Sequence, residues 1–141
     1  MQFDLGQVDT KTRSEDGVDM PVKLLSGAPL IAKNGQPVSI VLLGPDSKKY
    51  KAVMRRQVKK RLDRKESPSP DEQIEEAEQD GITMLVACTL GWKNVLDIEG
   101  KEIAFSAETA RILYGNYPVI ADQVDLFVTN RANFLLASSA A

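Results

Sequence analysis

Residues 47–90, SKKYKAVMRRQVKKRLDRKESPSPDEQIEEAEQDGITMLVACTL, decide how the middle of this chain is organised. In 47–66 the apolar residues recur at spacings of three and four, which predicts an amphipathic helix with Asp46 or Ser47 as its N-cap. The two prolines of 67–70 end this helix. The apolar positions of its predicted buried face are Tyr50, Val53, Met54, Val58 and Leu62.

A second helix is predicted to follow directly. Ser69 is a suitable N-cap, Pro70 occupies the first helical position, and Glu72 stands where a capping box places its acidic residue. The helix should run to about Leu90, since Gly91 is a typical residue at a helix C-terminus.

The two predicted helices carry opposite charges. The first is basic, and the first half of the second, residues 71–80, is acidic. The helices can therefore lie antiparallel with complementary flanks, or the basic row can contact a charged partner such as nucleic acid. A net charge of -2 and the lack of aromatic residues between the basic ones favour the first interpretation. The candidate partner-binding cations are Arg55, Arg56, Lys59 and Lys60.

The N-terminal third predicts strands. In residues 20–44, three short apolar runs are separated by Ser26-Gly27 and by Asn34-Gly35, a pair typical of tight hairpin turns. We expect a small antiparallel sheet of two or three strands here. Residues 1–19 are polar and acidic, and we expect them to be a flexible lead-in.

Beyond Gly91 the sequence predicts two more helices. Ser106 caps a helix of about ten residues, and Pro118 begins the last helix, whose broad apolar stripe reaches Phe134 or Leu135. Before them, residues 92–98 are expected to be either extended or an irregular helical turn, 99–101 a turn, and 102–105 a short extended segment. The final residues, 137–141, are too small and plain to pack and are expected to be a flexible tail.

Together these elements predict an α+β fold: a small N-terminal antiparallel hairpin or sheet, then a bundle of about four helices. We expect one domain over residues 20–136, with strands in 20–44 and mainly helix in 46–136. A chain of 141 residues is long enough to bury a core of this kind.

The aromatic side chains have two possible roles. They can be core residues that clamp the ends of the helices, or they can lie exposed and receive another chain, because aromatic anchors concentrate binding energy at interfaces. The candidates for partner binding are Trp92, Phe105, Phe127 and Phe134.

The composition argues against most enzymatic and metal chemistry. The chain has no histidine and a single cysteine, Cys88, so it lacks the commonest general base and metal ligand and cannot form an internal disulfide. It has no glycine-rich phosphate-binding motif, and the carboxylates of 71–80 read as a solvated helix face. We therefore expect no catalytic, cofactor-binding or metal-binding residues. No apolar run approaches the length of a membrane span, and no signal peptide is recognisable, which predicts a soluble cytoplasmic protein.

The order of turn, cap and packing residues over about 17–136 resembles the tail assembly chaperones of long-tailed, siphovirus-type bacteriophages. The strongly basic helix 47–66 departs from the pattern of that family. The residues that carry the resemblance are Gly44-Pro45-Asp46-Ser47 before a charged helix, Gly91-Trp92 after an acidic one, Asp97-Ile98-Glu99-Gly100-Lys101, Phe105-Ser106, and Tyr117-Pro118.

The resemblance implies a non-enzymatic role. Such chaperones coat the tape measure protein in the host cytoplasm, keep it soluble, and leave as tail tube protein replaces them, so they are absent from the mature virion. Expected partners are the tape measure protein, other copies of the chain, a longer form made by translational frameshift, and indirectly the tube protein. Two alternatives stay open: a structural tail component, such as a tube or tail completion protein, or a nucleic-acid-binding regulator that uses helix 47–66.

Overall fold

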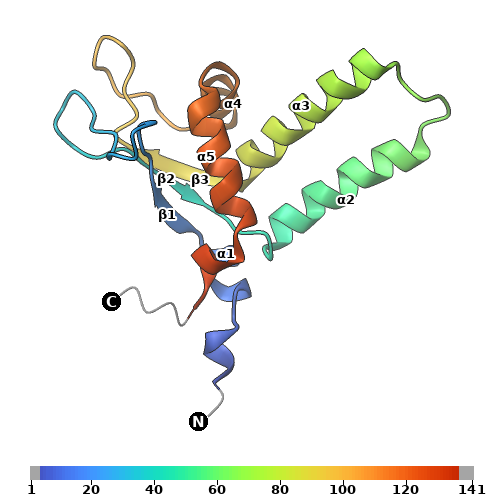
Figure 1. Ribbon diagram of the computed structural model, residues 1–141, viewed down its shortest axis with the longest axis horizontal. Coiled ribbons are helices and arrows are strands. Elements are labelled where there is room, and N and C mark those ends of the chain that lie inside the picture. Colours follow the sequence, from blue (N-terminus) through green and yellow to red (C-terminus); the bar gives the residue numbers. More distant parts are fainter. Residues whose placement is uncertain (1–3, 137–141) are drawn as a thin grey trace.

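The structure, a computed structural model, describes residues 4–136 and confirms the α+β class. Three strands form one sheet, and the helices follow or flank it (Figure 1). In chain order the elements are η1 Leu5–Gln7, α1 Lys11–Asp16, β1 Val18–Pro21, β2 Ser39–Leu42, α2 Lys48–Asp63, α3 Pro70–Cys88, β3 Thr89–Lys93, α4 Ala107–Asn116, α5 Pro118–Thr129 and η2 Arg131–Phe134.

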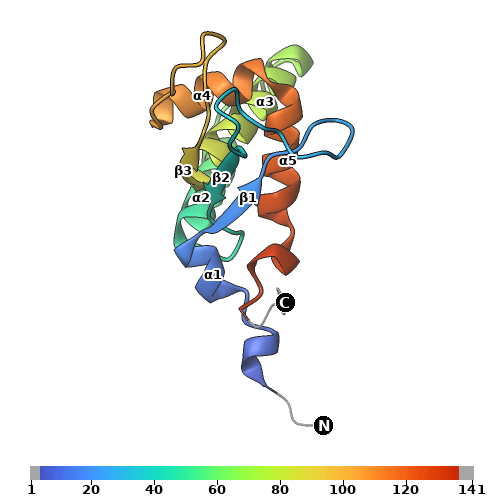
Figure 2. The ribbon, with the colours of Figure 1, turned by 90° about the vertical axis from the view of Figure 1, so that its left-hand side faces the viewer.

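The sheet is antiparallel with the order β1-β2-β3, so β2 is central. Its inward residues Ile40 and Leu42 are fully buried, and α5 lies across this buried face (Figure 2). The third strand does not come from the predicted region 20–44. It is β3, which begins immediately after α3, so that helix ends before the predicted Leu90 and Gly91 lies inside a strand.

Thr89 explains why the chain changes direction there. Its buried hydroxyl donates to the carbonyl of Leu85 at 2.7 Å and lies 2.7 Å from the hydroxyl of Tyr114 on α4. From Thr89 on, the backbone pairs with β2 and no longer continues the helical ladder. The strand therefore depends on partners that are distant in the sequence.

Between β1 and β2 the chain forms two narrow loops and no further strand. Isolated bridges join Lys23 to Pro29 and Ile31 to Pro37. The predicted turn at Asn34-Gly35 is present, and Gly35 has a φ of 82°, which favours glycine. Pro29 and Pro37 have no N–H to donate, so the pairing cannot extend into longer strands.

The expectation of a flexible lead-in at 1–19 is wrong for the part that the structure describes, because α1 packs against the body. Ser14 is fully buried, and its carbonyl accepts a hydrogen bond from Gly44 N–H at 3.0 Å. The Glu15 carboxylate accepts from Lys48 N–H at the start of α2. Residues 1–3 and the predicted flexible tail 137–141 lie outside the described residues.

The helix starts follow their local sequence. Ser47, Ser69 and Ser106 each accept a hydrogen bond from the first turn of α2, α3 and α4, and Pro118 begins α5, all as predicted. The last apolar stripe is interrupted after Thr129, and η2 carries Phe134 back into the core.

The second half of α3 belongs to the core, through Met84, Leu85 and Cys88. The first half of α3 and most of α2 project from the body as an antiparallel pair, which we call the helical hairpin (Figure 1). The apolar residues of the sheet are buried in the core, whereas several apolar residues of the helical hairpin are exposed.

Two glycines provide a matched test of this packing. A Cβ atom at Gly44 would overlap Ser14 Oγ and lie 2.7 Å from Phe134 Cγ, whereas one at Gly81 in α3 would meet nothing within 4 Å. Gly44→Ala should lower the free energy of unfolding by about 1–3 kcal/mol because the site is already full. Gly81→Ala should raise it by about 0.5–1 kcal/mol because alanine favours the helix. Urea unfolding measures both, and equal effects of the two changes would contradict the described packing.

Candidate partner-binding surface

A buried carboxylate joins the two helices of the hairpin. Asp80 of α3 is 9% exposed and lies 2.8 Å from Lys60 Nζ and 2.8 Å from an Arg61 guanidinium nitrogen. Glu76, one turn earlier, pairs with Arg64 at 2.5 Å. The interpretation that the basic and acidic helices lie antiparallel with complementary flanks is therefore confirmed.

These contacts also change how the carboxyl groups titrate. Burial by itself raises the pKa of Asp80, but the hydrogen bonds and charges of Lys60 and Arg61 outweigh it and hold that pKa below its usual value of 3.8. The Arg64 hydrogen bond likewise lowers the pKa of Glu76. Both groups are therefore charged at neutral pH, and the ion pairs persist there.

The ion pairs determine which residues face outward. The row of α2 that meets α3 contains Gln57 and Arg61, and the matching row of α3 contains Glu76 and Asp80. The next residue along a helix is turned by about 100°, and two antiparallel helices turn in opposite senses when viewed from one end. The residues that follow these rows therefore fall on the same side of the hairpin.

That side is apolar. Val58 and Leu62 follow the contact row of α2, and Ala77 and Gly81 follow that of α3. Met54 and Ile74 extend the two stripes by one turn each. We call these six residues the hairpin face: Met54, Val58, Leu62, Ile74, Ala77 and Gly81.

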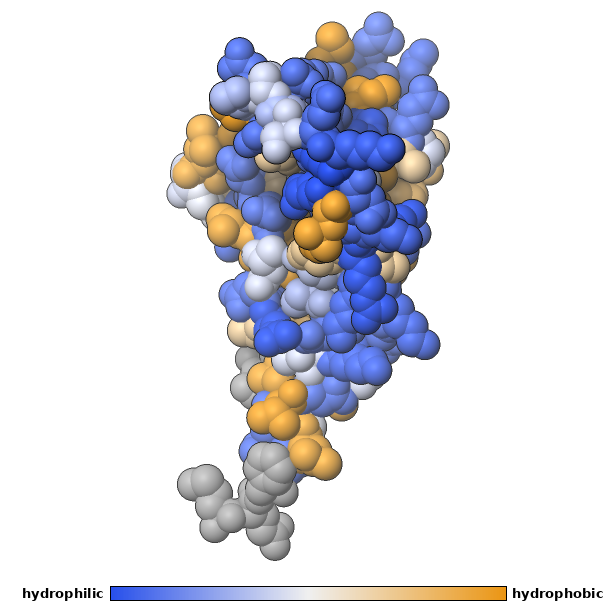
Figure 3. Space-filling view, turned by 90° about the vertical axis from the view of Figure 1, so that its right-hand side faces the viewer, coloured by the Kyte–Doolittle hydropathy of each residue, from blue (hydrophilic) through white to orange (hydrophobic). Residues whose placement is uncertain are grey.

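The hairpin face is open. The exposed fractions are 41% for Met54, 44% for Val58, 79% for Leu62 and 60% for Ile74. The sequence predicted that the α2 stripe would be buried, but only its first residues are covered: Val53 is buried and Tyr50 is half-buried, whereas Met54, Val58 and Leu62 are exposed. Figure 3, which looks at the side from which the hairpin projects, shows apolar side chains among the charged ones. Adjacent exposed apolar residues of this kind are typical of an interaction surface.

Charged residues of opposite sign border the hairpin face on its two outer edges. On α2 the edge contains Lys51, Arg55 and Lys59, and on α3 it contains Asp71 and Glu78. All five are exposed, and none takes part in the ion pairs found among residues 4–136. We call these edges the basic rim and the acidic rim.

The structure separates the cations predicted to bind a partner. Arg55, Arg56 and Lys59 are exposed, whereas Lys60 is paired with Asp80. Arg56 lies on the side of α2 away from the hairpin face, so it belongs to neither rim. The predicted basic row is therefore divided between an internal ion-pair network and an exposed edge.

The predicted aromatic contacts are mostly internal. Phe134 is 0% exposed, so its prediction as a partner-binding residue is wrong for this conformation; its ring packs edge-on against Phe127 at 5.6 Å. Trp92 is half-buried, donates from Nε1 to the Ile103 carbonyl at 2.7 Å, and packs edge-on against Phe105 at 5.2 Å. These rings hold segments together, and their size alone was a poor guide to the surface.

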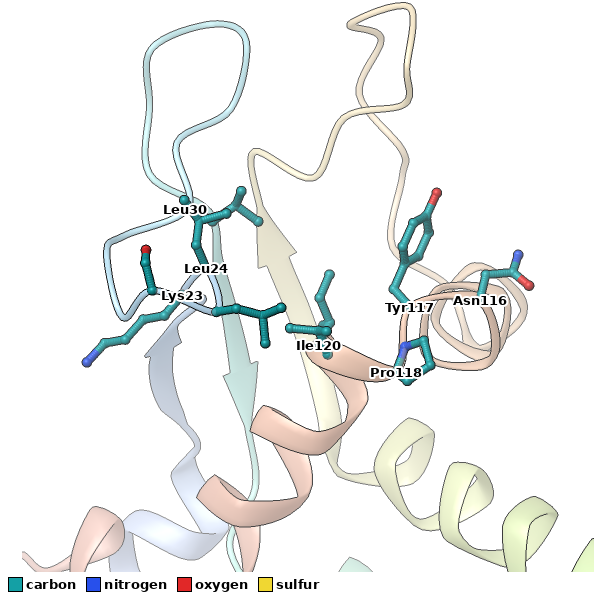
Figure 4. A pocket seen from close by; sticks show the side chains of 10 residues that line it. Lys23, Leu24, Leu30, Asn116, Tyr117, Pro118 and Ile120 are labelled. Carbon is teal, nitrogen blue, oxygen red and sulfur yellow. The ribbon is translucent and has the colours of Figure 1, made fainter.

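A second apolar surface, which the sequence analysis missed, lies at the other end of the body. A hollow of about 550 Å³ is bordered by the loop after β1 and by the junction of α4 and α5, where Leu24 and Leu30 lie across from Tyr117 and Ile120 (Figure 4). The Gln123 side chain holds this loop, since it accepts from the N–H of Lys23 at 2.8 Å and donates to its carbonyl at 2.7 Å. The hollow can accept an apolar side chain, but few polar groups converge on it.

The described residues offer little reactive chemistry. The Cys88 thiol is buried, and burial raises its pKa to about 12, so it stays protonated at neutral pH and is a poor nucleophile. Within residues 4–136, no group of three or more acidic or cysteine side chains is placed to hold a metal ion. In the same range no helix combines the length and the apolar character needed to cross a membrane.

Comparison with known proteins adds no relationship: no family model, no curated protein and no solved structure matches this chain.

The Asp80 network predicts a specific pH dependence. The pKa of Asp80 is lower in the folded protein than its usual value of 3.8, so its pairing stabilises the fold above about pH 4 and is lost as the pH falls through the folded-state pKa. Asp80→Asn should lower the free energy of unfolding at pH 7 by about 1–3 kcal/mol and should weaken the loss of stability below pH 4. Urea unfolding between pH 2 and 7 tests this.

The control is Asp63→Asn, because Asp63 is exposed at the end of α2 and forms no ion pair with the rest of the described chain. It should leave both the stability and its pH dependence nearly unchanged. If the two variants behave alike, Asp80 does not hold the hairpin together.

Proposed function

We propose that this chain is a non-enzymatic tail assembly chaperone of a long-tailed bacteriophage, and that it keeps the tape measure protein soluble before the tail tube forms. The observation that carries the proposal is the hairpin face, an exposed apolar strip on two projecting helices. The sequence resemblance supplies the biological context. A chaperone of this type needs an apolar surface that accepts many helical segments, and the hairpin face has that character.

The chemistry of the surface suits a varied helical client. An amphipathic helix can place its apolar side chains against the hairpin face without any specific hydrogen-bond pattern. Met54, Val58, Leu62 and Ile74 are the available anchors. A single contact of this size is weak, but many copies bound along one long client add up to strong retention through multivalency.

The proposal places the protein in the host cytoplasm and outside the mature virion. Its further partners would be other copies of the chain, a longer frameshifted form, and indirectly the tail tube protein. A structural role in the tail is the main alternative. A nucleic-acid-binding role has less support, because Lys60, Arg61 and Arg64 are occupied by the carboxylates of α3.

Co-expression with the tape measure protein of the same genome tests the proposal. The wild-type chain should raise the soluble fraction of the tape measure protein several-fold, and the double variant Val58→Ser, Leu62→Ser should lose most of this effect because two apolar anchors are gone. Fractionation and quantitative immunoblotting measure the result. Purified tail particles should lack the chain, whereas a structural component would be present in them.

Ile98→Ser is the matched control, since Ile98 is 85% exposed and lies in the loop after β3, outside the hairpin. This variant should protect the client as well as the wild-type chain does. If the tape measure protein is equally soluble without the chain, or if the hairpin variant protects it fully, the proposal fails.

A further inference from the structure

We infer that the two charged rims make the hairpin face directional: it binds an amphipathic helix that has acidic residues on one flank and basic residues on the other, and the order of these charges sets which way the helix points. The inference rests on the proposed function in one respect, that the hairpin face binds helices. It adds the charge pattern of the partner and its orientation.

The geometry of the face defines where the partner lies. A helix placed along the hairpin face, parallel to α2 and α3, presents its apolar stripe to Val58, Leu62 and Ile74, and its two flanks then approach the two rims. The flank beside α2 meets Lys51, Arg55 and Lys59. The flank beside α3 meets Asp71 and Glu78. An acidic flank toward α2 and a basic flank toward α3 therefore complement the surface.

A second copy of this chain fits the face poorly. The rows that form the face continue along α3 into Met84, Leu85 and Cys88, which are buried, so the body lies on the same side as the face. Two hairpins packed face to face and pointing the same way would bring both bodies to one end, where they would collide. Two hairpins pointing in opposite ways would set α2 against α2 and place one basic rim on the other. A separate helix meets neither obstacle.

The handedness of the α-helix converts the rims into a direction. For a helix that runs parallel to α2, from the body toward the hairpin tip, the residue after each apolar position lies beside α3 and the residue before it lies beside α2. A repeat of Glu-Leu-Lys therefore matches the rims when its N-terminus is at the body. A repeat of Lys-Leu-Glu matches them when it is reversed, with its N-terminus at the tip.

Two designed peptides test this on the full chain. Both have four turns of helix with leucine at positions 2, 6, 9 and 13 of the design; in one, glutamate precedes and lysine follows each leucine, and in the other these are exchanged. Each carries a nitroxide at its N-terminus. Paramagnetic broadening of the amide signals of the ¹⁵N-labelled chain then reports which end of the hairpin lies near that N-terminus.

The glutamate-first peptide should broaden the amide of Lys51, near the start of α2, and the lysine-first peptide should broaden that of Glu66, in the loop that joins α2 to α3. At low salt the preferred direction should exceed the other by about tenfold, because several exposed pairs act together. At 1 M salt, where the screening length is about 3 Å, the preference should disappear. Broadening of the same end by both peptides, or of both ends equally, would overturn the inference.

A charge-reversed variant provides the control. This variant combines three substitutions of exposed residues, Lys51→Glu, Arg55→Glu and Lys59→Glu. The chain should fold normally, and both rims become acidic. The direction preference should vanish, although the signals of Val58 and Ile74 should still shift. The inference would also be overturned if these signals did not shift when a peptide is added to the unaltered chain. The same holds if sedimentation shows that the free chain is a dimer and the hairpin variant Val58→Ser, Leu62→Ser is not.

The two proposals can fail separately. If the designed peptides bind without a preferred direction while the tape measure protein is kept soluble, the proposed function survives and the inference falls. If the peptides bind directionally but the tape measure protein gains nothing from co-expression, the directional surface stands and its client is a different helical protein.

Discussion

The carboxylate of Asp80 is the contact on which the arrangement of the hairpin depends. It is nearly buried, and it is accompanied by two cations, Lys60 and Arg61, and by a hydrogen bond from Gln57 Nε2 to its own backbone carbonyl at 2.9 Å. A rotation of α2 by one residue would remove these partners and leave a charge in a poorly solvated place, which is costly. The same contact therefore fixes the register and the rotation of α2. Since apolar residues follow the contact row by one position, joining the helices also exposes the hairpin face.

Local chemistry made much of the fold predictable. Ser47, Ser69 and Ser106 are caps, and Pro118 begins a helix, because each effect depends on residues within one turn. The third strand was not predictable in this way. Residues from Thr89 on are apolar enough to continue a helix, and they form β3 because β2, about fifty residues earlier in the chain, offers an open edge. The packing of α1 is equally non-local, since it needs a glycine at Gly44 to admit Ser14 and Phe134.

The candidate surface was less predictable than the fold, for a physical reason. Met54, Val58 and Leu62 have the spacing of a buried helix face, and whether such a face is buried depends on how far the body extends beside it. Here the body ends near Val53, so the same pattern is covered at one end of α2 and open at the other. The size of the aromatic rings was also a poor guide to the surface, because the rings pack against one another: Trp92 against Phe105, and Phe127 against Phe134. The sequence did contain one indication of this exposure: α2 carries so many lysine and arginine residues that a core could not enclose it.

The dimensions of the open surface bear on how it can be used. From Met54 to Leu62 the exposed stripe covers nine residues, a rise of about 12 Å along the helix, so a bound helix contacts it over little more than two turns. Burial of a few side chains over that length favours weak binding and rapid release, because much of the gain is offset by the entropy lost on association. The charged rims add little to the binding free energy, but they can determine the direction in which a helix binds. On a short apolar strip that has no hydrogen-bond pattern of its own, charge order is the one feature that can distinguish the two directions of a helix, and a row of identical sites would then hold a long client with a single polarity.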